Sequence, residues 1–368
     1  MYKEKINICN NQKNRIDAID VAKGIGILCI VFGHAAPDSV LRYILYSFHV
    51  PLFFVLSGLT YNNKKNKKSF LVGKIRRLLI PYYIFAIISI LIYFIMAKII
   101  LLPGDTRIIP NLIGMVYANS NSGYMTWNRP LWFLPCLFIT SIIIELFENL
   151  LQYLGDKSSE KFRWIFLLFA WGIGIALNDD GTSYYLPFHL ESAIFLSGFF
   201  EFGIILATVE AKNGLIEKIK AQKIDNWVLL AFALICVGFL ACDFNGTTDI
   251  RIHRFGNFPV CLILSSLTFS LVMLIASIKF EGIKWLSYVG RSSLAIMLMH
   301  KFPILFFQEI VPVVKVFLKN TNSFLGGMCA FGVTMVTVVM CLIAEKIIDA
   351  LFPWMLGKSR EDSYRRGK

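Results

Sequence analysis

Long apolar runs separated by short polar segments dominate this 368-residue sequence. Each of ten runs comes near the ~20 residues that an α-helix needs to cross a bilayer. They cover 19–36, 41–61, 78–101, 130–153, 164–178, 187–209, 226–242, 258–278, 292–312 and 324–350. Such runs fold as helices, because lipid offers no hydrogen-bond partner to exposed backbone groups. We therefore predict an all-α, polytopic integral membrane protein with about ten transmembrane helices. A membrane domain, 19–350, would lie between a cytoplasmic N-terminal segment, 1–18, and a cytoplasmic basic tail, 351–368.

Composition excludes other broad classes of protein. Hydrophobic residues make up 56% of the chain and charged residues 17%, with a mean hydropathy of +0.62. Soluble, disordered, collagen-like and disulfide-scaffold proteins do not have this balance. The eight cysteines contain no C-x-x-C pair and mostly sit in apolar runs, so we expect packing residues rather than a metal site. The first run lacks a small-residue cleavage site, which favours a retained span over a signal peptide.

The distribution of the excess basic residues predicts how the chain is oriented across the membrane. The net charge is +13, and placing both termini in the cytoplasm puts 26 Lys and Arg residues on that side against eight outside. This bias agrees with the positive-inside rule. The positive net charge is therefore explained by the membrane topology, and a nucleic-acid partner is not expected.

Three polar residues distinguish the first span. Lys23 and His34 are eleven positions apart, which brings them to within about 20° of one helix face, about 16 Å apart along the axis. Asp20, three residues before Lys23, can pair with it. Ionisable groups in a span are costly and mark functional sites. A lone buried histidine is more often a packing residue, but this combination favours a functional interpretation.

The second span adds His49 and Ser57 within FHVPLFFVLSG. On antiparallel neighbours, His49 and His34 lie at comparable depth and can converge on one cavity. The alternative is that His49 caps a helix near the interface. Pro51 frees a backbone carbonyl and predicts a kink. We interpret Ser57 as a packing hydroxyl rather than a nucleophile.

A basic cluster closes the next loop, in KIRRLLIPYY. Lys74 and Arg77 are neighbours on a helix, and the cluster can bind lipid headgroups or the phosphates of a nucleotide-bearing cofactor. Spacing alone favours lipid.

Weaker polar positions lie in later spans. Arg129 and Trp132 open the fourth span, where they can contact sugar or anchor the interface. His300 in the ninth can line a cavity or snorkel. Four further groups are Glu145, His189, Glu191 and Glu201.

Five segments resemble the acyltransferase 3 family of integral membrane acyltransferases, most closely its fucose 4-O-acetylase-like branch. They are RIDAIDVAKGIGILCIVFGH (Arg15 to His34), FHVPLFFVLSG (Phe48 to Gly58), KIRRLLIPYY (Lys74 to Tyr83), RPLWFLP (Arg129 to Pro135) and GRSSLAIMLMH (Gly290 to His300). The first two are specific, and the likeness extends over nearly the whole chain.

The resemblance implies about ten core helices, a cytoplasmic acyl-CoA donor, usually acetyl-CoA, and a hydroxyl acceptor on a surface or lipid-linked sugar. His34 matches the family's essential histidine and Lys23 its Arg/Lys element. Lys74 and Arg77 match the basic pair that holds the CoA end, which reverses the preference for lipid. Lys23 and Lys74 stand where many relatives have Arg, and Val50 replaces a common Met. Some relatives carry a soluble acyl-handling domain, which we do not expect here, and this leaves the acceptor and the handover route open.

We therefore expect a membrane O-acetyltransferase in a bacterial-type cytoplasmic membrane, with no permanent cofactor. A histidine, with a usual pKa of about 6.5, suits His34 as general base, and an acetyl-histidine intermediate is the alternative. The catalytic set is His34, His49, Lys23 and Asp20. The donor set is Lys74, Arg76, Arg77 and Tyr82. The acceptor set is Arg129, Trp132, His300 and Ser57. The competing class is a transporter or flippase for a lipid-linked glycan, but the sequence lacks the two-half symmetry typical of carriers. Oligomeric state stays open.

Overall fold

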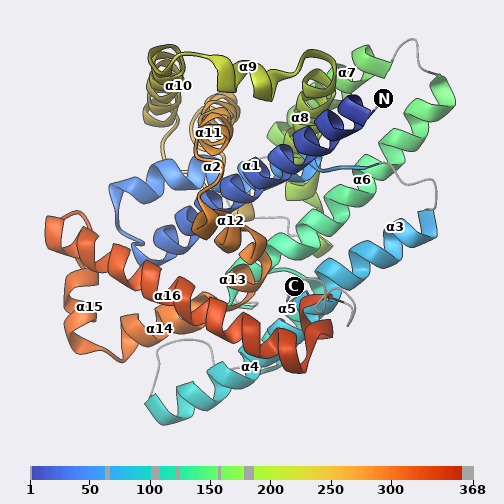
Figure 1. Cartoon of the computed structure of the whole chain (residues 1–368). Coiled ribbons are helices and arrows are strands. Elements are labelled where there is room, and N and C mark those ends of the chain that lie inside the picture. The colour runs from blue at the N-terminus through green and yellow to red at the C-terminus, as the bar shows by residue number, and fades with distance from the viewer. Residues whose placement is uncertain are drawn as a thin grey trace. The chain divides into compact units, whose positions relative to one another are not determined.

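The structure, a computed structural model, describes residues 2–62, 67–100, 108–120, 125–155, 159–177 and 186–358. Throughout these residues the ordered elements are helices, with one isolated bridge between Asp249 and Arg254 (Figure 1). Of the basic residues counted for the orientation, Lys64, Lys65, Arg107, Lys157 and those of 359–368 lie outside the described ranges.

The helices follow one another in a simple order, with short η turns between some of them. The long helices and their neighbours are α1 (Tyr2–Ala35), α2 (Val40–Leu59), α3 (Lys67–Lys74), η1 (Ile75–Leu79), α4 (Ile80–Ile100), α5 (Ile108–Tyr117), η2 (Arg129–Trp132), α6 (Phe133–Leu154), α7 (Ser159–Ala176), η4 (Pro187–His189), α8 (Leu190–Asn213), α9 (Leu215–Ala221), α10 (Ile224–Asn245), η5 (Ile250–Ile252), α11 (Pro259–Lys279), α12 (Lys284–Arg291), α13 (Ser293–Met299), α14 (Lys301–Glu309), α15 (Pro312–Leu318), α16 (Phe324–Leu351) and η6 (Pro353–Leu356).

Eight helices in the described part of the chain are long and apolar enough to cross a membrane. They are Asp17–Ala35, Val40–Leu59, Lys67–Lys98, Arg129–Leu154, Pro187–Asn213, Asp225–Asn245, Pro259–Lys279 and Phe324–Leu351. The prediction of an all-helical, polytopic membrane protein is confirmed.

Two of the ten expected spans are not among the eight. The run 164–178 lies mostly in α7, whose first turns carry Glu160, Lys161 and Arg163. The run 292–312 is divided, because α13 ends at Met299 and α14 starts at Lys301. Hydropathy averages over a window and therefore does not detect such a break.

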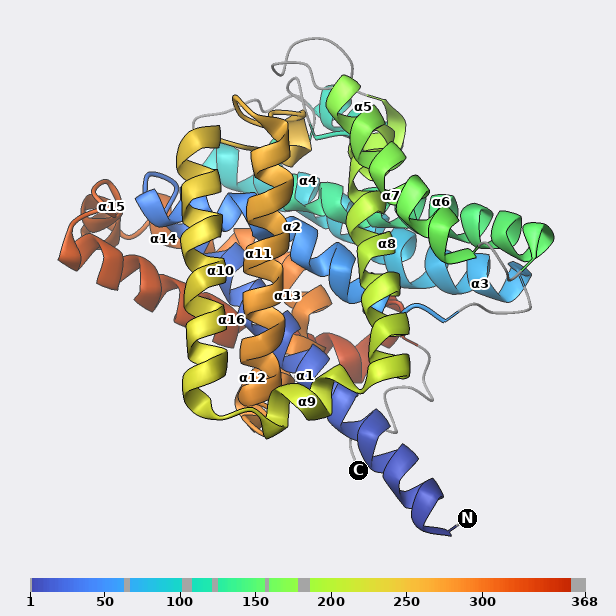
Figure 2. The same ribbon diagram turned by 90° about the horizontal axis from the view of Figure 1, so that it is seen from above.

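The chain forms two compact units. The first unit consists of 1–61, 199–248 and 255–293, and the second of 62–198, 249–254 and 294–368. In the first, α1 packs on α2, α11 and α12, and α10 packs on α11. Figure 2 shows α10 and α11 side by side, with α9 leading from α8 into α10. A buried apolar cluster holds these helices together, formed by Ile19, Ala22, Phe48, Leu52, Leu56, Cys242 and Phe269.

Glycines let helices of the first unit approach backbone to backbone. A Cβ at Gly290 of α12 would collide with the carbonyl of Asp20, and one at Gly24 with the carbonyl of Leu286. Small residues at such crossings are typical of membrane helix packing. They fix α1, which carries Lys23 and His34, against α12.

Pro51 lies inside α2 and has no N–H to donate to the carbonyl four residues earlier. That carbonyl belongs to Ser47, and it accepts a hydrogen bond from Ser266 Oγ of α11 at 2.5 Å. A polar group freed by the proline is thus satisfied by the next helix, as the bilayer interior requires.

In the second unit, α3, η1 and α4 form one continuous helical stretch, and α6 packs against η1. The turn η6 folds back onto α4. Lys358, just after η6, pairs with Glu345 at 3.1 Å and with Asp349 at 2.8 Å on α16. Gly357 has a φ of +68°, and a Cβ there would meet the backbone of Arg76 and Arg77. The end of the described chain therefore lies against the basic turn, which we define as Lys74, Arg76 and Arg77 at the start of η1.

Candidate functional site

The predicted site residues fall in both units. Asp20, Lys23, His34, His49 and Ser57 belong to the first unit. The donor set and the remaining acceptor residues belong to the second: Lys74, Arg76, Arg77, Tyr82, Arg129, Trp132 and His300.

A tyrosine brings His34 and His49 together. The hydroxyl of Tyr46 lies 3.4 Å from Nδ1 of His34 at the end of α1. Its ring meets that of His49 edge-on, with centroids 4.8 Å apart. His34 is half-buried and His49 only 6% exposed. The expectation that the two histidines converge is consistent with this arrangement.

The surroundings of His49 define its tautomer. Its Nδ1 lies 2.5 Å from the carbonyl oxygen of Leu45, which can only accept a hydrogen bond. Nδ1 therefore carries the proton, and in the neutral ring Nε2 carries the lone pair. A tyrosine hydroxyl can donate or accept, so Tyr46 can follow either protonation state of His34.

Arg42 supports Tyr46 from one turn earlier in α2. Its guanidinium carbon lies 4.3 Å from the centre of the tyrosine ring, within the range of a cation–π contact. Its Nη1 donates to the carbonyl of Pro37 at 3.0 Å. Sequence reasoning missed both Arg42 and Tyr46. The signal is their spacing: Arg42 stands four residues before Tyr46, and Tyr46 stands three before His49, which places all three on one helix face.

The predicted pairing of Asp20 with Lys23 is present, with carboxylate and ammonium 3.9 Å apart. The second carboxylate oxygen lies 3.8 Å from Arg291 of α12, a partner that the sequence did not reveal. Asp20 therefore links α1 to α12 and is 8% exposed. Ser57 Oγ donates to the carbonyl of Phe53 at 2.7 Å, which agrees with a packing hydroxyl.

Arg76 and Arg77 lie in η1, a short π-helical turn between α3 and α4, and Lys74 lies just before it. The N–H of Ile80 bonds to the carbonyl of Ile75, an i→i+5 pattern found at functional sites. Lys74 donates to Ser141 Oγ of α6 at 2.9 Å. Arg76 is half-buried and Arg77 is exposed. Arg77 is therefore the member of this set most available to a ligand in solution.

Tyr82 contacts the helix α5. Its hydroxyl donates to the carbonyl of Met115 on α5 at 3.1 Å. It is buried and lines a narrow cavity together with Trp132, Ser120 and Asn128. Arg129, in the turn that ends with Trp132, is exposed. Tyr82 thus shares a cavity with an expected acceptor residue.

His300 marks the break between α13 and α14. It is fully buried, and its Nδ1 lies 2.9 Å and 3.0 Å from the carbonyls of Ile296 and Met297. Its burial excludes snorkelling. At the same break, the carbonyl of Leu298 accepts a hydrogen bond from Asn128 Nδ2 at 3.0 Å.

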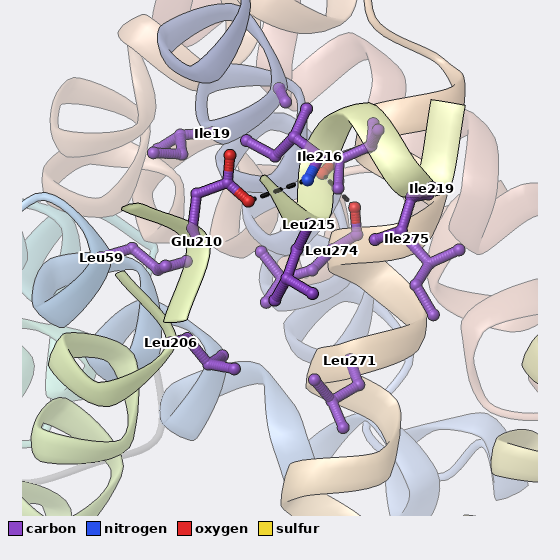
Figure 3. Close-up of a pocket in the computed structure, with 13 residues that line it drawn as sticks. Ile19, Leu59, Leu206, Glu210, Leu215, Ile216, Ile219, Leu271, Leu274 and Ile275 are labelled. Carbon is purple, nitrogen blue, oxygen red and sulfur yellow. Dashed lines mark hydrogen bonds between the residues drawn. The ribbon is translucent and has the colours of Figure 1, made fainter. Parts of the chain in front are cut away.

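A separate apolar cavity of about 110 Å³ lies in the first unit (Figure 3). Its lining is aliphatic, with Leu59, Leu206, Leu271 and Ile275 among the side chains that point into it. Glu210 is the only carboxylate in the lining, and it accepts from the N–H of Ile216 at 2.8 Å. Its carboxylate caps the start of α9, so this cavity offers no free group for acyl transfer.

Comparison with protein families gives one match over most of the chain. The acyltransferase domain model of the acyltransferase 3 family matches residues 16–344. Neither curated proteins nor solved structures gave a significant match. The matched range includes the histidines, the basic turn and the Trp132 cavity. The chain belongs to the acyltransferase 3 family, and it is an integral membrane acyltransferase.

Proposed function

We propose that this acyltransferase is an O-acetyltransferase that takes acetyl groups from cytoplasmic acetyl-CoA. The acceptor is a hydroxyl of a cell-surface or lipid-linked sugar, as in the fucose 4-O-acetylase-like branch. The membrane is a bacterial-type cytoplasmic membrane with both chain termini inside. The observation that carries this proposal is the contact of His34 with Tyr46, itself in contact with His49.

His34 acts as the general base. It removes the proton of the acceptor hydroxyl while the oxygen attacks the acetyl carbonyl. The new bond joins the acceptor oxygen to the acetyl carbon, the carbon–sulfur bond of the thioester breaks, and His34 returns the proton to the departing CoA sulfur. Tyr46 holds the imidazole, and His49 binds the acceptor or supports the base. Positioned histidines supply about 10²–10⁴-fold in such steps.

Lys74, Arg76 and Arg77 hold the phosphates of CoA. Charge-assisted hydrogen bonds to phosphate are the strongest in proteins, and guanidinium groups make them in pairs. Lys23 offers a positive charge on the face of α1 that also carries His34, about 16 Å away along the axis. It neutralises charge along the path of the pantetheine arm.

The test uses inside-out membrane vesicles that contain the protein and a sugar-linked lipid fraction. Acetyl-CoA radiolabelled in the acetyl group is added outside, and label in the glycan is counted. Wild-type protein is expected to label the glycan, and His34→Gln, purified with the same unfolding midpoint, is expected to lose at least 100-fold in rate. Translocation of the glycan without label would contradict the enzyme assignment. Normal labelling by His34→Gln would contradict the role of His34 alone.

A further inference from the structure

The apolar cavity of the first unit lies where several helices end (Figure 3). Its lining comes from the start of one membrane-spanning helix, Asp17–Ala35, and from the last turns of three others, Val40–Leu59, Pro187–Asn213 and Pro259–Lys279. The short helix α9 completes the lining and lies across the ends of α8 and α11 in Figure 2. The cavity therefore lies at the end of the apolar spans, the level at which a bilayer changes from acyl chains to headgroups.

Hydrocarbon suits this cavity better than water. Its lining contains two polar side chains, and each is satisfied within the protein. Glu210 accepts from the N–H of Ile216, and Ser277 Oγ donates to the carbonyl of Leu274, both at 2.8 Å. An apolar cavity of about 150 Å³ stays dry and binds apolar molecules. This cavity, at about 110 Å³, is of similar size and partly open, so it can take several methylene groups of a chain that enters from outside.

The helix α9 provides an apolar wall with basic residues beside it. Its aliphatic side chains Leu215, Ile216 and Ile219 line the cavity. At about 100° per residue, Lys218 and Lys220 lie on either side of this apolar face. Glu217, the acidic residue of α9, lies on the opposite face. Such a pattern is typical of a helix that rests on a membrane surface.

Two lysines bring positive charge to the edge of the cavity. Lys279 follows Ile278 of the lining, and its Nζ donates to the carbonyls of Lys220 at 3.4 Å and of Gln222 at 3.2 Å. These bonds hold the ammonium group at the end of α9. Lys218 is exposed. Among the described residues, no carboxylate forms an ion pair with either lysine, whereas Lys220 pairs with Glu281 at 2.5 Å.

We infer that this cavity binds one acyl chain of an anionic bilayer phospholipid, whose phosphate group lies at Lys218 and Lys279. The inference goes beyond the proposed acetyl transfer and does not depend on it. The aliphatic lining matches the chain, because burial of methylene groups is favourable. The two lysines match the phosphate, as basic pockets near the membrane surface do. The distribution of basic residues predicts that this end of the unit faces the cytoplasm, where the leaflet carries anionic lipid.

The acyl group of the donor does not fit this place as well. Ile19 of the lining stands fifteen residues before His34 on α1, which separates the two by about 22 Å along the helix axis. The proposed transfer takes place at His34. An acyl group bound in the cavity is therefore out of reach of the base.

Leu271→Trp tests the chain site, because Leu271 points into the cavity and a larger side chain fills it (Figure 3). The matched control is Leu264→Trp on the same helix, where Leu264 is 43% exposed. If Leu271→Trp does not fold, Leu206→Trp on α8 fills the same cavity and takes its place.

Lys218→Gln and Lys279→Gln test the phosphate site. Lys279→Arg keeps the charge and is expected to keep the binding. Lys319→Gln is the control for Lys218→Gln, because Lys319 is also exposed and lies between α15 and α16, on the predicted outer side. The unfolding midpoints of the lipid-free variants are compared first, so that a loss of lipid is not mistaken for a loss of fold.

Each variant is purified in dodecyl maltoside, freed of lipid and titrated with dioleoyl phosphatidylglycerol, and native mass spectrometry measures the lipid bound. Dioleoyl phosphatidylcholine has the same chains without net charge. Wild-type protein is expected to bind one phosphatidylglycerol at least tenfold more tightly than phosphatidylcholine. Leu271→Trp weakens the binding of phosphatidylglycerol at least tenfold, and Lys218→Gln and Lys279→Gln each weaken it about fivefold. The values for Leu264→Trp, Lys319→Gln and Lys279→Arg stay within twofold of the wild type.

Three results would overturn the inference. Unchanged binding of phosphatidylglycerol by Leu271→Trp would show that the chain does not enter the cavity. Equal binding of the two lipids, or equal affinities of Lys218→Gln and Lys319→Gln, would exclude the anionic headgroup. Octanoyl-CoA that binds more tightly than phosphatidylglycerol, and that Leu271→Trp no longer binds, would assign the cavity to an acyl donor instead.

Discussion

The hydroxyl of Tyr46 lies 3.4 Å from Nδ1 of His34 and joins a residue of α2 to the end of α1. Its ring also contacts His49, and Arg42 lies over it. One tyrosine therefore orients the proposed base and a second histidine together. The contact crosses the turn 36–39, so it depends on how the two helices pack.

Tyr46→Phe tests this relationship. The ring stays and the hydroxyl is lost, so His34 loses an orienting hydrogen bond but the packing survives. We expect kcat to fall about tenfold, the value of roughly 1.4 kcal/mol in a barrier, with both KM values within twofold. Tyr153→Phe is the control, because Tyr153 on α6 is 88% exposed. Equal kcat in the two variants would show that the hydroxyl does not act on the base.

Arg77→Gln tests the donor set. Arg77 is exposed, so its loss leaves packing intact and removes a charge that the proposal assigns to a CoA phosphate. We expect the KM for acetyl-CoA to rise about tenfold or more, the loss of one charged hydrogen bond. The rise shrinks as salt screens the wild-type interaction. Lys68→Gln, an exposed position on α3, is the control. A salt-independent change, or the same change in both variants, would contradict the assignment.

Gly290→Ala tests the close approach of α12 to α1. A Cβ there would collide with the carbonyl of Asp20, so the helices have to separate. We expect a loss of about 1–3 kcal/mol, typical of overpacking, seen as a lower thermal unfolding midpoint. Gly172→Ala on α7 is the control, since its Cβ meets nothing within 4 Å. That substitution leaves the midpoint unchanged or raises it. The collision would be refuted by equal midpoints.

Asp20→Asn tests the link between Lys23 and Arg291. The substitution leaves two cations without the carboxylate that lies between them, so we expect a lower unfolding midpoint. If the ion pair is the cause, Arg291→Gln costs less in the Asp20→Asn background than in the wild type. A double-mutant cycle measured by denaturation in detergent decides the matter. Strictly additive effects of the two substitutions would show that the ion pair between Asp20 and Arg291 does not contribute to stability.

Local relationships were predictable from sequence, and contacts between distant segments were not. The pairing of Asp20 with Lys23 follows from helical spacing alone. Arg291 reaches the same carboxylate through the packing of α12 on α1, which no local pattern encodes. Tyr46 belongs to an intermediate case. Its spacing from His49 was readable, but its contact with His34 requires the structure.

The remaining differences have physical reasons as well. The polar stretch after α4 contains the helix α5, and the carbonyl of Met115 on α5 accepts a hydrogen bond from the hydroxyl of Tyr82. The ninth apolar run looked continuous, but it is interrupted at His300. The positive φ of 51° at His189 has no signal in the sequence, because a positive φ in an ordinary residue is set by its neighbours in space.

Gly357 lies on the backbone of Arg76 and Arg77 beyond the end of the matched family domain. The adjoining turn η6 carries Trp354, which is 57% exposed. Because its indole lies in the turn next to this contact, the fluorescence of Trp354 can report on the basic residues. A change in that fluorescence would follow the binding of acetyl-CoA over time without an added dye, and Trp354→Phe would give the background signal from the other tryptophans.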